Sequence, residues 1–226
     1  MMQNNVPPEQ GPVVSHAAPA APTPPPKRPI HRRRKNEGWN NVISTISVLL
    51  LAPIIAVFLT AFVFQSYQVD GPSMQATLHN NDRLIVWKLS KTWARITGQT
   101  YIPNRGDVVI FTEQALSNYG QDPTKQLIKR VIALPGERVT IKDGIVTVFN
   151  KDNPEGFQPD KTLPYGNVIT ESPGDVDTIV PQNELFVLGD NRANSLDSSE
   201  FGPVFAGNVV GKLALRILPL GDAKLF

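Results

Sequence analysis

The chain has 226 residues, with 22 basic and 20 acidic side chains and no cysteine, a length that fits one good-sized domain plus accessory segments. Six of the basic residues fall between Lys27 and Lys35, and from Val42 onward the acids outnumber the bases by two. The body is therefore not a basic surface, which argues against nucleic acid as a partner. The lack of cysteine excludes disulfides, thiolate nucleophiles and cysteine-based metal sites, and it leaves the redox compartment open.

Residues 1–38 hold nine of the 21 prolines, together with alanines, amides and the basic cluster. A segment of this composition buries too little apolar surface to offset the entropy of ordering it. We therefore expect a disordered tail. The proline run at residues 24–26 also fits a polyproline ligand, but a solvated tail is the simpler interpretation.

Residues 42–64 form a stretch of 23 residues without a charge. A helix of that length, rising about 1.5 Å per residue, spans the roughly 30 Å hydrocarbon core of a bilayer. The basic cluster precedes it, so the positive-inside rule places the N-terminus in the cytoplasm and the rest of the chain outside. A cleavable signal peptide has a shorter tail and core, and a buried soluble helix rarely carries so long an uncharged run. We expect one uncleaved transmembrane helix.

After this stretch the pattern changes to short runs with β character. Strands are predicted at residues 64–69, 83–89, 107–111, 139–142, 145–149, 184–188 and 209–218. The two-residue link Asp143-Gly144 between two of these runs is a strong hairpin signal. The runs lack regular helical crossovers, which favours a mainly β, antiparallel domain over residues 65–226.

The first candidate for chemistry is Ser73, in the sequence Gly-Pro-Ser-Met-Gln-Ala-Thr-Leu at residues 71–78. Taken alone, it would be an ordinary serine in a turn. A serine hydroxyl is a weak nucleophile until a base takes its proton, and histidine is the usual base. His16 and His31 precede the uncharged stretch, and His79 lies only six residues after the serine, so a Ser-His-Asp triad has little support.

Lys129 is the alternative base, in a predicted strand that reads Gln-Leu-Ile-Lys-Arg-Val-Ile-Ala-Leu from residue 126. Alternate residues of a strand share a face, so Lys129 lies with Leu127 and Val131, and Arg130 lies on the opposite face. Burial against apolar neighbours lowers the pKa of a lysine and makes it a general base. The competing interpretation is that Lys129 reaches solvent or pairs with an acid. A Ser-Lys dyad is the arrangement that the sequence allows.

A loop at residues 188–199, dense in Asp, Asn and Ser, follows a predicted buried strand. Such side chains bond their own backbone and hold a loop rigid. Ser195 could orient the lysine amine, and Asp197 could brace the loop. A calcium site is disfavoured because the spacing does not match the twelve-residue calcium loop, so we expect no metal.

Together these segments resemble the type I bacterial signal peptidases, over roughly residues 40–218 and in the order of that family. Besides residues 71–78, the motifs are Arg-Gly-Asp-Val-Val-Ile-Phe at 105–111, Lys-Arg-Val-Ile-Ala-Leu-Pro-Gly-Glu at 129–137 and Gly-Asp-Asn-Arg-Ala-Asn-Ser-Leu-Asp-Ser at 189–198. The resemblance implies a membrane-anchored serine endopeptidase that removes N-terminal signal peptides from exported preproteins through an acyl-enzyme, without a cofactor. It also implies a signal-peptidase-like β fold with a variable insertion at about residues 143–182.

The resemblance also implies roles for individual residues. Ser73 matches the nucleophile, with its backbone N–H as an oxyanion donor, Lys129 the general base, Ser195 the serine that bonds the lysine, and Asp197 the acid of the last motif. The substrate is expected to add as a strand beside two short segments. These segments consist of Gln68, Val69 and Asp70, and of Gln126, Leu127 and Ile128.

The implied partners are preproteins with Ala-x-Ala signal peptides, the lipid bilayer and, as a further candidate, the secretion translocon. The implied protein is a monomer in the plasma membrane, crossing it once, with its N-terminus cytoplasmic and its catalytic domain outside.

Three residues depart from the family pattern: Ala76 stands where proline is usual, Ser199 where arginine is common, and Gly71 where some members have serine. Two other functions stay open. A self-cleaving Ser-Lys repressor would need a DNA-binding domain, for which residues 1–41 are too rich in proline. An inactive membrane-bound module would keep the β scaffold without the chemistry.

Overall fold

The computed structural model describes residues 37–163, 168 and 170–226, so the predicted disordered tail of residues 1–38 lies almost wholly outside the described residues. Two compact units divide at residue 45, and all strands belong to the second, which runs from Ile46 to Phe226.

The predicted apolar stretch falls on a long helix. Helix α1 (Glu37–Phe58) continues into one π-helical segment, η1 (Leu59–Val63), and strand β1 then begins at Phe64. Asn41–Val63 has a mean hydropathy of 2.7, which makes the helix long and apolar enough to cross a membrane. Its side chains are mostly exposed, as at Leu49, where 72% of the surface is accessible. A helix that is apolar all round and uncovered by protein fits a lipid environment.

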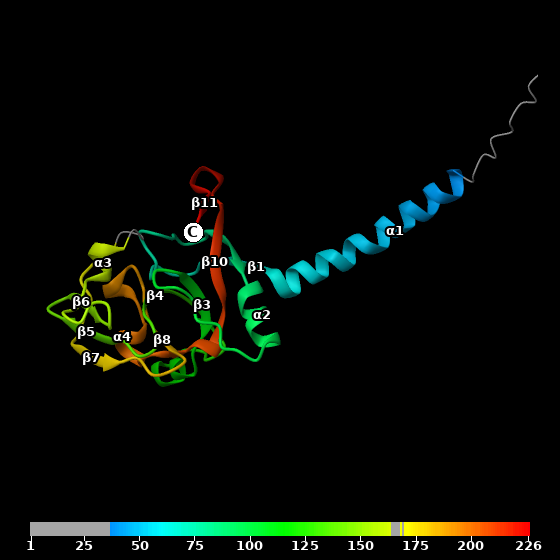
Figure 1. The fold of residues 1–226 in the computed structure, drawn as a ribbon. Helices are drawn as coiled ribbons and strands as arrows, with labels where there is room; N and C mark the ends of the chain where they lie inside the picture. Colours follow the sequence, from blue (N-terminus) through cyan, green and yellow to red (C-terminus); the bar gives the residue numbers. More distant parts are fainter. Residues whose placement is uncertain (1–36, 164–167, 169) are drawn as a thin grey trace, which may run out of the picture. The chain divides into compact units, whose positions relative to one another are not determined.

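The main sheet contains eight strands, several of which are labelled in Figure 1. Its order is β1-β2-β10-β3-β4-β8-β9, and β11 pairs with β10. Every pairing is antiparallel, which confirms the predicted mainly β, antiparallel fold. The strands are β1 (Phe64–Gln68), β2 (Arg83–Trp87), β3 (Val108–Thr112), β4 (Gln126–Ala133), β8 (Glu184–Leu188), β9 (Val204–Phe205), β10 (Val209–Leu218) and β11 (Lys224–Leu225).

A second sheet of three antiparallel strands has the order β6-β5-β7. Its strands are β5 (Arg138–Lys142), β6 (Ile145–Phe149) and β7 (Val176–Ile179). The turn between β5 and β6 is the predicted Asp143-Gly144 link, and both residues have positive φ, 50° and 78°. Two consecutive positive φ angles are typical of the type I′ hairpin turn, whose twist matches that of the flanking strands.

Short helices connect the strands. They are α2 (Leu89–Ile96), α3 (Pro159–Thr162), α4 (Ser198–Phe201) and the 3₁₀ segments η2 (Gln114–Tyr119), η3 (Arg192–Asn194), η4 (Ala206–Asn208) and η5 (Leu220–Asp222). The sequence left residues 90–104 ambiguous, and α2 occupies the start of that segment. It did not predict η2, which a Gly120 in the left-handed region ends.

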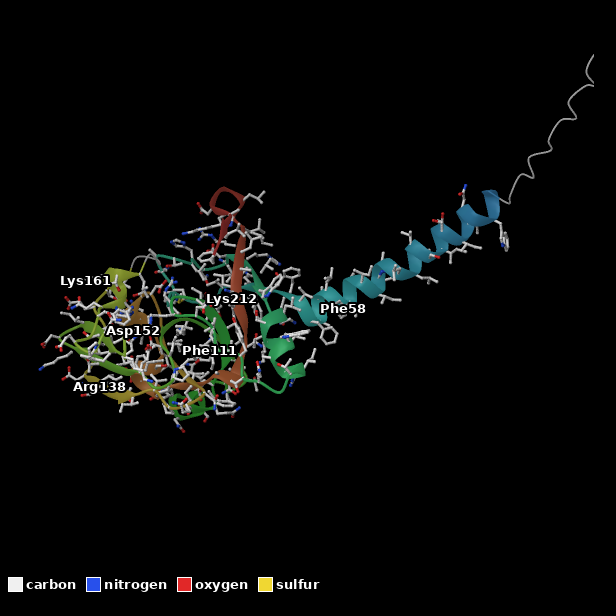
Figure 2. The ribbon with its side chains drawn as sticks, viewed as in Figure 1. Phe58, Phe111, Arg138, Asp152, Lys161 and Lys212 are labelled. Atoms are coloured by element: carbon white, nitrogen blue, oxygen red, sulfur yellow. The ribbon has the colours of Figure 1, made fainter. Side chains whose placement is uncertain are left out.

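The core lies around β3, β4 and β8, whose side chains are buried on both faces of the sheet. Figure 2 shows Phe111 of β3 inside the body, whereas Arg138 and Asp152 lie at the surface near the second sheet. Strand β4 pairs with β3 on one side and β8 on the other, so it is a central strand. Any charged residue in its second half is therefore buried and needs a partner.

Candidate active site

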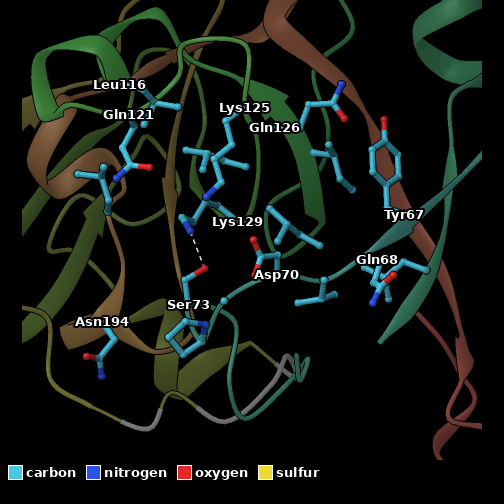
Figure 3. A pocket seen from close by; sticks show the side chains of 18 residues that line it. Tyr67, Gln68, Asp70, Ser73, Leu116, Gln121, Lys125, Gln126, Lys129 and Asn194 are labelled. Carbon is cyan, nitrogen blue, oxygen red and sulfur yellow. Dashed lines mark hydrogen bonds between the residues drawn. The ribbon is translucent and has the colours of Figure 1, made fainter. Parts of the chain in front are cut away.

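Ser73 lies in a tight turn just after β1. The turn begins at Gly71, whose φ of 103° is a conformation that residues with a Cβ rarely adopt. The loop after β8 holds it: the Asn191 N–H donates to the Ser73 carbonyl at 3.0 Å, and Asn191 Nδ2 donates to the Pro72 carbonyl at 3.2 Å. Met74 is buried in the core. The turn is therefore fixed, and the Ser73 hydroxyl faces a cavity (Figure 3).

Lys129 is buried in the central strand β4, as its position among apolar residues predicts. Its Nζ donates a hydrogen bond to Ser73 Oγ at 2.7 Å, drawn as the dashed line in Figure 3. A nucleophile and a base that lie within hydrogen-bond reach meet the geometric condition for proton transfer. When the amine is neutral, the same contact lets its lone pair accept the hydroxyl proton.

Burial lowers the pKa of Lys129 from 10.5 to about 8. Desolvation of the ammonium is the main cause, and the positive charge of Lys125 adds to it. The carboxylates of Asp197 and Asp190 oppose the shift, because a negative charge stabilises the ammonium. A substantial fraction of Lys129 is therefore neutral at mildly alkaline pH.

Arg130, the next residue, points to the other side of β4 and is also buried. Its guanidinium binds both oxygens of Asp190, at 2.8 and 2.6 Å, and donates to the Gly106 carbonyl. The Thr77 hydroxyl donates to the same carboxylate at 2.5 Å. Because Thr77 follows the nucleophile turn and Asp190 opens the loop after β8, this buried network ties both segments to the strand that carries Lys129.

Asp197 is the helix cap that closes the same loop. One carboxylate oxygen accepts the N–H of Gly189 at 2.9 Å, and the other accepts the N–H and the hydroxyl of Ser199 at 3.1 and 2.8 Å. It is the N-cap of α4. Ser199 thus braces the aspartate through two hydrogen bonds.

Gly189 lies where the loop and the nucleophile turn come together. A Cβ added there would clash with Ser195 Oγ and would lie 2.5 Å from the Ser73 carbonyl oxygen, so no larger residue fits. Ser195 Oγ is itself buried, and it makes no hydrogen bond to any residue that the structure describes. Its predicted contact with the lysine amine stays a prediction.

Arg192 joins this loop to the segment that follows the second sheet's hairpin. Its side chain is buried and forms a bidentate pair with Asp160 of α3 at 2.6 Å, and it also donates to the Ser172 hydroxyl. Its Nε donates to the Gly189 carbonyl at 2.9 Å. Gly189 is thus held by Asp197 through its N–H and by Arg192 through its carbonyl.

A cavity of about 380 Å³ opens beside the dyad. It is lined by Ser73 and Lys129 and by all six residues predicted to bind substrate, which are Gln68, Val69, Asp70, Gln126, Leu127 and Ile128. The structure therefore brings the two predicted substrate segments to opposite walls of one cavity. Ser195 and Asp197 lie in the supporting loop and do not line it.

The sequence predicted no role in the catalytic site for several residues of this region. Tyr67 and Lys125 line the cavity, and Thr77, Asp190 and Arg192 hold the segments around it. The sequence did contain one signal for an acidic residue in this region. Arg130 lies on the face of β4 opposite Lys129, and an arginine buried in a central strand needs an acidic partner. Nothing in the sequence shows which acid that is, since the partner lies 60 residues away.

Comparisons with known proteins give one family. A family model described as signal peptidase, peptidase S26, matches residues 42–218. A signal peptidase I of Bacillus licheniformis is 32% identical over 187 residues, covering 82% of this chain and 93% of that protein. A probable signal peptidase I-1 of Synechocystis is 32% identical over 185 residues, covering 80% and 85%. A crystal structure of a signal peptidase I from Enterococcus faecalis is 26% identical, with a TM-score of 0.37, and covers 51% of this chain and all of that one.

Proposed function

The chain belongs to the signal peptidase family, peptidase S26, and we propose that it is a membrane-anchored serine endopeptidase that removes N-terminal signal peptides from exported preproteins. Membership of the family was expected from the motifs and is confirmed by the match. The observation that carries the proposal is the 2.7 Å contact between buried Lys129 Nζ and Ser73 Oγ beside an open cavity.

The mechanism uses the two side chains in turn. Neutral Lys129 accepts the proton of Ser73, and Oγ attacks the carbonyl carbon of the scissile peptide bond. The backbone N–H of Ser73 stabilises the oxyanion, with no hydroxyl at Gly71 to help it. The ammonium of Lys129 returns the proton to the leaving amine, which yields the acyl-enzyme and the free mature protein.

Water completes the cycle. Lys129, neutral again, takes a proton from a water molecule that attacks the acyl carbon, and the proton then passes to Ser73 Oγ as the ester bond breaks. In this scheme Ser195 orients the lysine amine and Asp197 holds the loop that carries Ser195. Support for the scheme comes from the packing of that loop against Ser73 through Gly189.

The substrate is proposed to lie extended between the two walls of the cavity, adding as a strand beside Gln68–Asp70 and Gln126–Ile128. The residues at the first and third positions before the cut then point to the same side, into the cavity. We propose alanine at both positions, as the resemblance to the family implies.

We further propose that the uncharged helix anchors the chain in the plasma membrane, crossing it once, with the basic N-terminal segment in the cytoplasm. Residues 65–226 are then the extracytoplasmic catalytic domain, a monomer, with the variable insertion at residues 143–182. Ser73 follows the last helical residue by ten positions, which suits substrates that leave the membrane or the translocon there.

An acylating inhibitor that reacts with activated serines tests this proposal. The full-length protein in detergent is expected to gain one inhibitor adduct, which peptide mapping locates at Ser73. Lys129→Ala is expected to abolish the adduct, and Ser117→Ala, a change in η2 outside the cavity, to leave it unchanged. An unlabelled wild-type protein would identify an inactive membrane-bound module instead.

A further inference from the structure

Helix α2 has an apolar face that the described part of the chain does not cover. Leu89, Trp93 and Ile96 are four and three residues apart, so they share one side of the helix. All three side chains are exposed. Large apolar side chains that form one exposed surface mark a place where another molecule binds.

Hydrogen bonds attach α2 to the end of the proposed membrane helix. The Thr92 hydroxyl donates to the Phe62 carbonyl at 3.0 Å. Lys88, the N-cap residue of α2, donates through Nζ to the Thr60 and Ala61 carbonyls at 3.2 and 3.0 Å. These three carbonyls belong to η1, where the apolar span ends. In a bilayer crossed by that span, α2 therefore lies at the level of the lipid headgroups.

A groove of about 610 Å³ is lined by the end of the apolar span and by α2. Its apolar part is formed by Phe58 and Phe62 on one side and by Trp93 and Ile96 on the other. Because Phe58 and Phe62 belong to the helix that is proposed to cross the membrane, this part of the groove is open to lipid acyl chains.

Two positive charges, Lys91 and Arg95, line the same groove. They are four residues apart, about one turn of α2, and neither forms an ion pair with an acid among the described residues. Lys91 Nζ donates to the Gly207 carbonyl at 3.2 Å, which uses one of its three protons. Burial lowers the pKa of Lys91, and the charge of Arg95 adds to the effect. An anion bound to both side chains offsets their repulsion.

We propose that this groove binds one anionic phospholipid from the membrane leaflet on the catalytic side. The phosphate lies against Lys91 and Arg95, and one acyl chain lies along Phe58 and Phe62. An anionic lipid is favoured over a zwitterionic one, because two cations attract a headgroup with a net negative charge. The inference rests on the proposed membrane anchor and goes beyond it, since an apolar helix alone selects no particular lipid.

The test places a fluorophore beside the groove, which is simple in a chain without cysteine. Ile96→Cys in the full-length protein is labelled with nitrobenzoxadiazole and reconstituted into phosphatidylcholine vesicles. The vesicles also contain phosphatidylglycerol or phosphatidylcholine with a nitroxide on the acyl chain, at the same mole fraction. We expect the phosphatidylglycerol nitroxide to quench the fluorophore at least about twofold more strongly, because the two cations enrich the anionic lipid at the groove.

Charge variants show whether the two cations cause this preference. Lys91→Gln combined with Arg95→Gln is expected to make quenching by the two lipids equal. Lys142→Gln combined with Lys151→Gln removes the same charge from exposed positions in β5 and after β6, and it should keep the preference.

A second labelling position controls for lipid that is near the protein without being bound. Ile179→Cys in β7 is matched in exposure, at 66% against 72% for Ile96, and is expected to show no preference between the lipids. Equal quenching at Ile96→Cys overturns the inference, as does a preference that survives the loss of both cations. Cleavage of a model preprotein by the same vesicles reports the proposed enzymatic function separately. A chain that does not float with the vesicles refutes the membrane anchor, and the inference with it.

Discussion

At the scale of single residues, the central feature is a lysine that the fold keeps out of water. Burial lowers the pKa of Lys129 to about 8, while Asp197 and Asp190 act in the opposite direction. Asp197 has this effect because its contacts are N–H and hydroxyl groups rather than a cation. The serine at position 199 thus bears on the charge state of the base.

The pH dependence of the reaction follows from these charges. The neutral lysine is the active form, so kcat/KM should fall about tenfold per pH unit below about pH 8. Asp197→Asn removes a negative charge that stabilises the ammonium, which lowers the lysine pKa and should move this acid limb to lower pH. Ser199→Arg should move it the same way. Asp177→Asn, which changes an exposed ion pair, is the control and should leave the acid limb in place. An acid limb that moves to higher pH in Asp197→Asn would contradict the account.

Protonated Lys129 should also lower the free energy of unfolding. Its pKa is about 8 when folded and 10.5 ordinarily, so between these values the unfolded chain binds the proton more tightly. The penalty is complete below pH 8, at up to about 3 kcal/mol, and disappears as the pH rises toward 10.5. Lys129→Met should therefore raise Tm at pH 7, by an amount that shrinks above pH 8. A lower Tm at pH 7 would show that the ammonium is stabilised in the fold.

At the scale of elements, two ion pairs of equal length differ in their surroundings. Arg130–Asp190 and Arg138–Asp177 are both 2.6 Å apart, but the first is buried between β4 and the loop after β8 and the second is exposed between β5 and β7. Distance alone does not rank their contributions to stability. When one partner of a buried pair is removed, the remaining charge lies in the interior without water to solvate it.

Removing one partner of each pair tests this ranking. Asp190→Asn leaves the buried Arg130 without its carboxylate and should destabilise the protein by about 3–5 kcal/mol. Asp177→Asn should leave Tm within error. Thermal unfolding of both variants in the same detergent gives the comparison, and equal effects would contradict it.

The elements also show what the sequence can and cannot predict. Strand alternation placed Lys129 on an apolar face of β4, and the Asp143-Gly144 pair predicted a hairpin, because both signals are local. The partner of Arg130 and the contact of Arg192 with Asp160 join residues far apart in the chain, and no local pattern encodes them. Tyr67 lines the cavity because β1 pairs beside β2, and no local pattern in the sequence indicates that position.

At the scale of the whole molecule, the proposed topology places the strands of residues 65–226 on one side of the membrane and the basic N-terminal segment on the other. The chain has no cysteine, so a single introduced thiol reports its own position without background. Asp152 is exposed in the segment after β6 and suits labelling, and Ser15 lies in the N-terminal segment.

In intact spheroplasts, a membrane-impermeant maleimide should label Asp152→Cys, because that residue lies in the extracytoplasmic domain. It should label Ser15→Cys only after the membrane is permeabilised. The opposite pattern would reverse the orientation, and labelling of both variants in intact cells would show that the uncharged helix does not cross the bilayer.

The most direct measurement is cleavage of a purified model preprotein by the full-length protein in detergent, with Ser73→Ala and Lys129→Ala beside the wild type. The account predicts that the wild type cuts once, at the signal peptide junction, and that each variant is at least about 10³-fold slower because nucleophile and base act as one unit. If either variant cuts at the wild-type rate, Ser73 and Lys129 are not the catalytic pair.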